Sequence, residues 1–199
     1  MKKNHWLLFL AVFCVVQSTF GQIGKTQDLL AVHNWQLSDL DKVGISKLYP
    51  AISYPSQQDN WRWCNKCQGL FFGGNASKGV CFDKQAHSSQ GSGNYALIQG
   101  AGTFVQDNWR WCQKCQGLFF TGNGTAGVCF KGGSHASSGS GNYHLEQNSS
   151  ILSTDFQGGW TWCSRCEGLY FGEGKNKGAC PAGGLHVNSG SGNYVLIQK

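Results

Sequence analysis

The sequence predicts an all-β protein built from three tandem modules. The first observation behind this prediction is a segment of about 40 residues that recurs at 60–99, 108–147 and 159–198. Glycine is abundant, with 29 residues in a chain of 199, and aromatic residues make up 13%. Charged residues also make up only 13%, fewer than a helical bundle or a coiled coil contains. The composition therefore fits short strands joined by glycine-rich turns.

The N-terminus has the order of segments found in a secretory signal peptide. Lys2 and Lys3 form a basic start, an apolar run follows at 6–16, and small residues precede a cleavage site after Gly21. An apolar run of this length is too short to cross a bilayer comfortably. The sequence therefore predicts a signal peptide at residues 1–21, a secreted or extracytoplasmic protein, and no membrane span.

The mature chain divides into an extension and three modules. Residues 22–58 contain no cysteine and precede the repeats, so we interpret them as an N-terminal extension. The predicted modules span 59–99, 107–147 and 158–199, and the extra residues between the second and third copies fall in the linker. Within a module, the stretches that differ between copies are rich in glycine and asparagine, which indicates loops.

Each module is expected to form about four short strands and no helix. In the first copy, large and polar residues alternate at 61–63, which is typical of a strand. The turn Cys64–Cys67 joins this strand to a second one at 69–72. A third strand is predicted at 80–82 and a fourth at 95–99. The Gly-Ser-Gly-Asn-Tyr segment before the fourth strand is interpreted as a turn, because phosphate-binding loops precede a helix.

Two arrangements of the modules fit this pattern. Three modules of four strands give twelve strands, as in a β-trefoil with pseudo-threefold symmetry. The leucine, phenylalanine, tyrosine and tryptophan residues that all copies keep need a shared core, which favours this compact form. The alternative is three independent zinc-ribbon-like modules on a string.

Every module carries three cysteines and one histidine at the same spacing, C-x2-C-x13-C-x5-H. Zinc in structural sites takes four tetrahedral ligands from thiolates and imidazoles, and a C-x-x-C turn directs two sulfurs at one ion. A module of about 40 residues is also too small to be held by a hydrophobic core alone. The sequence therefore predicts three structural zinc ions, one per module, with these ligands: Cys64, Cys67, Cys81 and His87; Cys112, Cys115, Cys129 and His135; Cys163, Cys166, Cys180 and His186.

Disulfides are the competing interpretation, because they are usual in exported proteins. Three cysteines cannot pair within a module without leaving one over, and the nine cysteines of the mature chain are also an odd number. Disulfides would leave the histidine at its fixed offset unexplained, so zinc is favoured. His33 and His144 have no equivalents in the other copies and are expected to be surface residues.

Two resemblances rest on these motifs. Residues 63–71 resemble the first knuckle of small zinc ribbons, although the second half of the module lacks the second tight cysteine pair of a ribbon. Residues 60–198 are also similar to a group of secreted proteins with tandem WxWCxxC…GSGNY repeats. These resemblances imply a metal-binding β-module, but they do not name a ligand.

Two tryptophans in each module are candidates for ligand binding. Aromatic faces stack on the apolar faces of sugar rings, and acidic or amide side chains nearby can bind hydroxyl groups. In each pair, packing at the core is the competing role. The residues concerned are Trp61, Trp63, Trp109, Trp111, Trp160 and Trp162, with Asp59 and Asp107 beside the first two pairs.

These observations favour a secreted, non-enzymatic binding protein with a glycan or cell-surface ligand. The alternative is a structural or protein-interaction module. Nucleic-acid binding is less favoured, because the chain without Lys2 and Lys3 has 14 basic and 10 acidic residues, a mild excess. No pair of carboxylates recurs across the copies, and the thiols are assigned to metal, so no enzyme is predicted.

Overall fold

The computed structural model describes residues 56–100, 105–147 and 155–199. The predicted signal peptide and nearly all of the predicted N-terminal extension lie outside these residues. The described part consists of strands and loops and contains no helix, which confirms the all-β prediction. Accordingly, no described segment is a helix that is long and apolar enough to cross a membrane.

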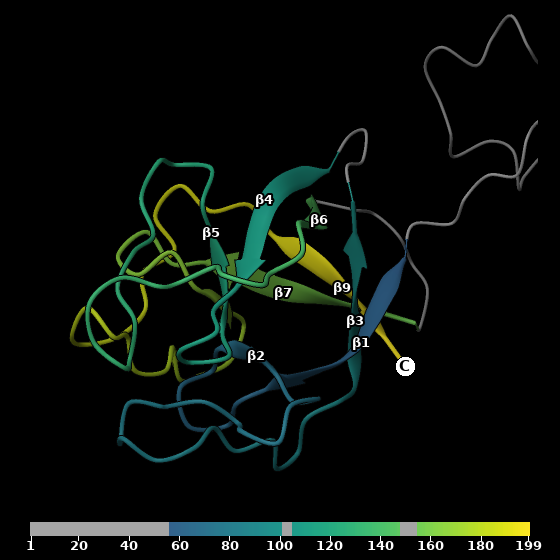
Figure 1. Cartoon of the computed structure of the whole chain (residues 1–199). Coiled ribbons are helices and arrows are strands. Elements are labelled where there is room, and N and C mark those ends of the chain that lie inside the picture. Colours follow the sequence, from purple (N-terminus) through teal and green to yellow (C-terminus); the bar gives the residue numbers. More distant parts are fainter. Residues whose placement is uncertain (1–55, 101–104, 148–154) are drawn as a thin grey trace, which may run out of the picture. The chain divides into compact units, whose positions relative to one another are not determined.

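Each module contributes three strands to one nine-stranded sheet (Figure 1). The strands are β1 (Gln57–Trp63), β2 (Leu70–Phe72) and β3 (Tyr95–Gln99) in the first module, β4 (Gln106–Trp111), β5 (Leu118–Phe120) and β6 (Tyr143–Gln147) in the second, and β7 (Phe156–Trp162), β8 (Leu169–Phe171) and β9 (Tyr194–Gln198) in the third. Within a module the first strand pairs with both of the others, always antiparallel.

The Gly-Ser-Gly-Asn-Tyr segment secures the first strand of each module. A bulge interrupts the β1–β3 ladder between Gln58 and Trp61. In the first module the side chain of Asn94 accepts a hydrogen bond from the backbone N–H of Asn60 at 3.0 Å, and the Ser92 hydroxyl accepts one from the N–H of Trp63 at 2.8 Å. The segment is therefore a turn whose side chains accept from one N–H inside the bulge and from another beyond the last β1–β3 pair.

The three modules join through their last strands, which pair in a closed cycle. Ile98 of β3 lies opposite His144 of β6, Glu146 of β6 lies opposite Val195 of β9, and Ile197 of β9 lies opposite Ala96 of β3. The C-terminal half of each strand thus meets the N-terminal half of the next. The compact pseudo-threefold arrangement is confirmed, and the alternative of independent modules is wrong.

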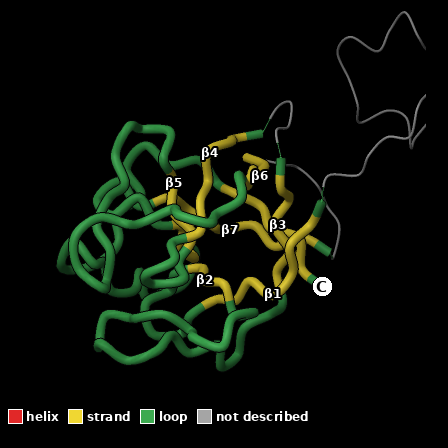
Figure 2. Tube along the Cα trace, viewed as in Figure 1, coloured by secondary structure: helices red, strands yellow, loops and turns green. Residues whose placement is uncertain are grey.

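The strand predicted at 80–82 does not form, so the described modules have three strands each and not four. The N–H of Cys81 donates to the carbonyl of Gln85 at 2.7 Å, and the carbonyl of Cys81 accepts from the N–H of Lys84 at 3.0 Å. These bonds close a local turn around the cysteine and leave it no ladder partner. The 22 residues between β2 and β3 are loop, as are the matching stretches of the other modules (Figure 2).

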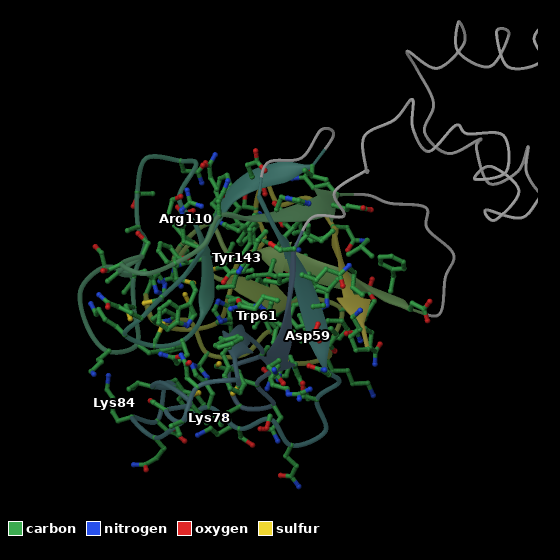
Figure 3. The ribbon with its side chains drawn as sticks, turned by 45° about the vertical axis from the view of Figure 1, so that its right-hand side comes forward. Asp59, Trp61, Lys78, Lys84, Arg110 and Tyr143 are labelled. Atoms are coloured by element: carbon green, nitrogen blue, oxygen red, sulfur yellow. The ribbon has the colours of Figure 1, made fainter. Side chains whose placement is uncertain are left out.

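A single aromatic core fills the space between the modules. The ring of Trp61 meets the ring of Tyr143 edge to face, with centroids 5.2 Å apart, and Figure 3 shows both side chains in the interior. The Tyr143 hydroxyl donates to the side chain of Gln58 at 2.5 Å. The other two module pairs repeat both contacts, through Trp109 with Tyr194 and through Trp160 with Tyr95.

Candidate metal centre

Three groups of three cysteines and one histidine come together, one in each module, and each could hold a metal ion. Within each group the four ligand atoms lie within 4.8 Å of one another. All nine cysteines of the described residues are buried free thiols. The groups are the ones that the sequence spacing predicts: Cys64, Cys67, Cys81 and His87; Cys112, Cys115, Cys129 and His135; Cys163, Cys166, Cys180 and His186.

The distances within the groups match the edges of a metal-centred tetrahedron. The sulfur atoms of the first and third cysteines lie 3.9, 4.0 and 3.8 Å apart in the three modules. The second cysteine sulfur lies 3.5 Å from the histidine Nδ1 in all three. Zn–S bonds of about 2.3 Å and Zn–N bonds of about 2.0 Å give tetrahedral edges of about 3.8 Å and about 3.5 Å. A disulfide would need sulfur atoms about 2.0 Å apart.

The hairpin turn between the first two strands positions the first cysteine pair. The N–H of Cys64 donates to the carbonyl of Gly69 at 2.9 Å, and the N–H of Gln68 donates to the carbonyl of Cys64 at 2.8 Å. Gln68 closes the turn in the left-handed region, with φ at +64°. This tight turn directs the sulfurs of Cys64 and Cys67 to the same side, as the resemblance to a zinc knuckle implies.

An aromatic residue of the second strand fixes the histidine. The imidazole of His87 stacks on the ring of Phe71, with centroids 4.8 Å apart and planes 19° apart. His135 stacks on Phe119 and His186 on Tyr170 in the same way, each at 4.6 Å. Along β2 the side chains alternate, so Phe71 packs with the cysteines and its neighbours Leu70 and Phe72 pack with the core. The paired aromatic residues of the motif therefore serve two different clusters.

The electrostatics of each group favour one thiolate. Hydrogen bonds from the Cys67 and Cys81 thiols hold the pKa of Cys64 far below its usual value, and the bond to Cys64 raises the pKa of Cys67. Burial lowers the pKa of His135, but hydrogen bonds with the Cys112 and Cys129 sulfurs outweigh burial and raise that pKa to about 9. A metal ion that takes all four ligands must therefore displace protons from the remaining thiols and the imidazole.

One basic side chain in each knuckle ties the cysteine turn to the loop that carries the histidine. Lys66 pairs with Asp83 at 2.7 Å, Lys114 donates to the carbonyl of Gly132 at 2.6 Å, and Arg165 donates to the carbonyl of Gly183 at 2.6 Å. These cations lie beside a ligand set that carries net negative charge when three thiolates bind a divalent ion. Through these contacts the three side chains stabilise the position of the loop relative to the cysteine turn.

The structure separates the two tryptophans of each predicted pair by their burial. The first tryptophan of each pair is completely buried, so its ring offers no face to a sugar; these residues are Trp61, Trp109 and Trp160. The second tryptophan of each pair is partly buried against the core; these residues are Trp63, Trp111 and Trp162. Asp59 is exposed, whereas Asp107 is partly buried and one of its carboxylate oxygens is covered.

His144 is buried, contrary to the expectation that it lies on the surface. Only 5% of its area is exposed, and its Nδ1 lies 3.1 Å from the carbonyl of Gly100. It occupies β6 opposite Ile98, at the contact between the first two modules. The other copies have Ala96 and Val195 at this position, so comparison of the copies could not show that the position is covered.

Two sets of residues at the centre were missed by sequence reasoning. The glycine two residues before the third cysteine of each module, at 79, 127 and 178, has positive φ and lies against the next knuckle. The residue after the second cysteine, at 68, 116 and 167, is buried although it is polar. The Gly-x-Cys spacing in every copy was the available signal for the first set.

No protein-family model matches the chain, and comparisons with curated proteins and with solved structures found no significant match.

Proposed function

We propose that the protein is a secreted, non-enzymatic binding scaffold held together by three structural zinc ions. The observation that carries the proposal is the set of tetrahedral edge distances, which recurs in all three modules. Thiolates and imidazoles in this ratio are ligands that zinc prefers, and four protein ligands leave no open position for a substrate.

The need for metal follows from what surrounds each centre. The loop between β2 and β3 contains Cys81 and His87, which are buried, whereas residues 74–77 and 82–86 are exposed. Such a loop has little apolar area to bury, so its position has to come from its ligands and hydrogen bonds. When bound, the ion supplies four bonds that link this loop to the knuckle.

A role without catalysis is supported by the space around the centres. A cavity of about 40 Å³ lies between the three knuckles, lined mainly by apolar atoms of Leu70, Leu118 and Leu169 and by the ligand residues. A cavity of this size admits only a few water molecules. It therefore offers no room for an organic substrate beside the thiols.

A glycan or a cell-surface ligand remains the favoured partner. The support comes from Trp63, Trp111 and Trp162, which recur on equivalent strands and are only partly buried. Three such positions would act together on a repeating ligand, because linked weak sites gain avidity. A glycan array with the mature chain should give binding that falls when all three are changed to alanine. Phe82→Ala, at a side chain that is 46% exposed, is the control; loss of binding in the control alone would reject these tryptophans as the site.

Zinc X-ray absorption of the purified mature chain tests the metal proposal directly. The expected first shell contains three sulfurs at about 2.3 Å and one nitrogen at about 2.0 Å. A shell with oxygen scatterers, or with fewer sulfurs, would mean that the ion is open to solvent and would contradict a purely structural role. Absence of any zinc edge would reject the proposal itself.

A further inference from the structure

The histidine of the first centre reaches beyond its own module. His87 directs Nδ1 at the Cys67 sulfur, and its other ring nitrogen, Nε2, lies 3.1 Å from the backbone carbonyl of Cys115. Cys115 is itself a candidate ligand of the second centre. A hydrogen bond from the free nitrogen of a ligating histidine fixes the tautomer and orientation of the ring. The knuckle of one centre thus positions a ligand of another.

A glycine contact repeats this relation at all three module boundaries. A Cβ atom on Gly79 would lie 2.0 Å from the carbonyl oxygen of Cys115, one on Gly127 would lie 2.1 Å from that of Cys166, and one on Gly178 would lie 2.1 Å from that of Cys67. Each glycine has positive φ, so it is suited to this approach. Each loop therefore docks on the next knuckle, and the third module docks back on the first.

The corresponding histidine nitrogens of the other two modules are buried but do not form this hydrogen bond. The Nε2 atoms of His135 and His186 are buried and have no hydrogen-bond partner among the described residues. A buried N–H group needs an acceptor. Cys166 and Cys67, the residues equivalent to Cys115, line the same central cavity as both histidines. The relation that repeats at all three boundaries is therefore the glycine contact.

Further hydrogen bonds, from the second strand and from the loop that follows it, hold each module to the neighbouring knuckle. In the first boundary the N–H of Phe72 donates to the carbonyl of Gln116 at 2.8 Å, and the side chain of Asn75 donates to that of Gln116 at 2.7 Å. The backbone bond recurs from Phe120 to Glu167 and from Phe171 to Gln68, each at 2.9 Å. The residue that carries these contacts directly follows a cysteine of the next metal-binding turn.

We infer that the three centres form one cooperative metal-binding ring, coupled through the contacts of Gly79, Gly127 and Gly178 with the neighbouring cysteine carbonyls. This inference rests on the proposed function. A metal ion that fixes one knuckle stabilises the carbonyl on which the neighbouring loop docks, and that loop carries the third cysteine and the histidine of its own centre. Coupling between two sites is reciprocal, so filling any centre raises the affinity of both others.

Native mass spectrometry of the mature chain during zinc titration tests the inference. At half saturation, three equal and independent sites would place about three quarters of the protein in species with one or two ions, whereas tenfold coupling of each pair reduces that share to about one quarter. We expect the apo and three-zinc species to dominate. A binomial distribution would overturn the ring but leave the proposed function intact. Absence of any bound zinc would instead reject the proposed function.

A glycine substitution identifies the contact responsible. Gly79→Ala places a methyl group against the Cys115 carbonyl, and loss of that one coupling should raise the share of species with one or two ions about twofold. Gly139→Ala is the matched control, since Gly139 has φ at +74° against +72° for Gly79 but no atom within 4 Å of the added Cβ. Equal effects of the two substitutions would assign the change to backbone strain and overturn the role of the contact. If Gly79→Ala does not fold, the wild-type distribution decides the question.

Discussion

The strand half and the loop half of each module are held by different interactions. The strands enclose a core in which Trp61, Trp109 and Trp160 are completely buried. The loops at 73–94, 121–142 and 172–193 contain no strand, and they lie on the side of the structure away from β3 and β9 (Figure 1). Apolar burial organises the first half, and a ligand set organises the second. A small repeat can therefore be stable although half of it lacks a hydrophobic core.

The three modules share the length of their loops and the core residues of their strands. The three loops have the same length of 22 residues, although the sequences of their first parts differ. Two ligands in each loop must reach the ion, and both ends of the loop are fixed by strands. The length of the loop is therefore constrained, whereas its exposed side chains are not. The strands instead keep the same residue at the central core positions, as at Trp61, Trp109 and Trp160, because a packed core responds to changes of volume.

Metal removal should give the largest effect and tests whether the two halves fold separately. Leu70 belongs to the core and Phe71 to the metal cluster, so the two halves share β2. We therefore expect chelation to unfold loops and strands together, with a loss on the order of 10 kcal/mol per ion. Hydrogen exchange should show protection lost in both halves. Retained protection of β3, β6 and β9 would separate the halves and contradict this expectation.

Removal of one buried tryptophan should give the next largest effect. Trp61→Ala leaves a cavity in the core and should lower the free energy of unfolding by about 3–5 kcal/mol. Trp63→Ala, at the partly buried position on the same strand, should cost clearly less. Denaturant titration of the zinc-loaded proteins measures both values. Equal losses would mean that the two tryptophans share one role, against the structure.

Removal of a single hydroxyl group at the contact between modules should have a smaller effect on the free energy of unfolding. Tyr143→Phe removes the hydrogen bond to Gln58 and should cost about 1 kcal/mol in the free energy of unfolding. Tyr170→Phe is the control, because the Tyr170 hydroxyl is buried without a hydrogen-bond partner among the described residues. Its removal should be neutral or stabilising, and the equivalent positions already carry Phe71 and Phe119. A loss at position 170 that equals the loss at 143 would contradict this reading.

The smallest effect is expected where the third module differs from the others. Burial raises the pKa of Glu167, so folding favours its protonated form and the carboxylate lowers stability once the pH rises above that pKa. Glu167→Gln, which copies Gln68 and Gln116, should raise stability at pH 7 by no more than about 0.5 kcal/mol. The gain should shrink toward pH 4, where Glu167 is protonated. Urea titrations at both pH values measure the difference, and a gain that grows on acidification would contradict the sign.

The local features were predictable from the sequence, and the contacts between modules were not. Fixed spacing identified all twelve candidate ligands, and alternation located the strands at 61–63, 69–72 and 95–99 within a few residues. The segment 80–82 has the composition of a strand but forms a turn, because its backbone bonds close locally around Cys81. Composition cannot show that choice.

Burial of single tryptophans was equally beyond the sequence. Trp61 and Trp63 point the same way along one strand, yet Trp61 is fully buried and Trp63 only partly. The difference arises because Trp61 packs against Tyr143 of the second module. Such a contact depends on the cyclic pairing of β3, β6 and β9, which no local pattern specifies.

Metal content of the purified protein comprising residues 22–199, measured together with its free thiols, tests the central claim most directly. The account predicts three zinc ions per chain and nine thiols that react only after the metal is chelated. A chain with no metal and few free thiols would contradict it, since oxidised cysteines would then hold the modules and the three histidines beside them would have no ligand role.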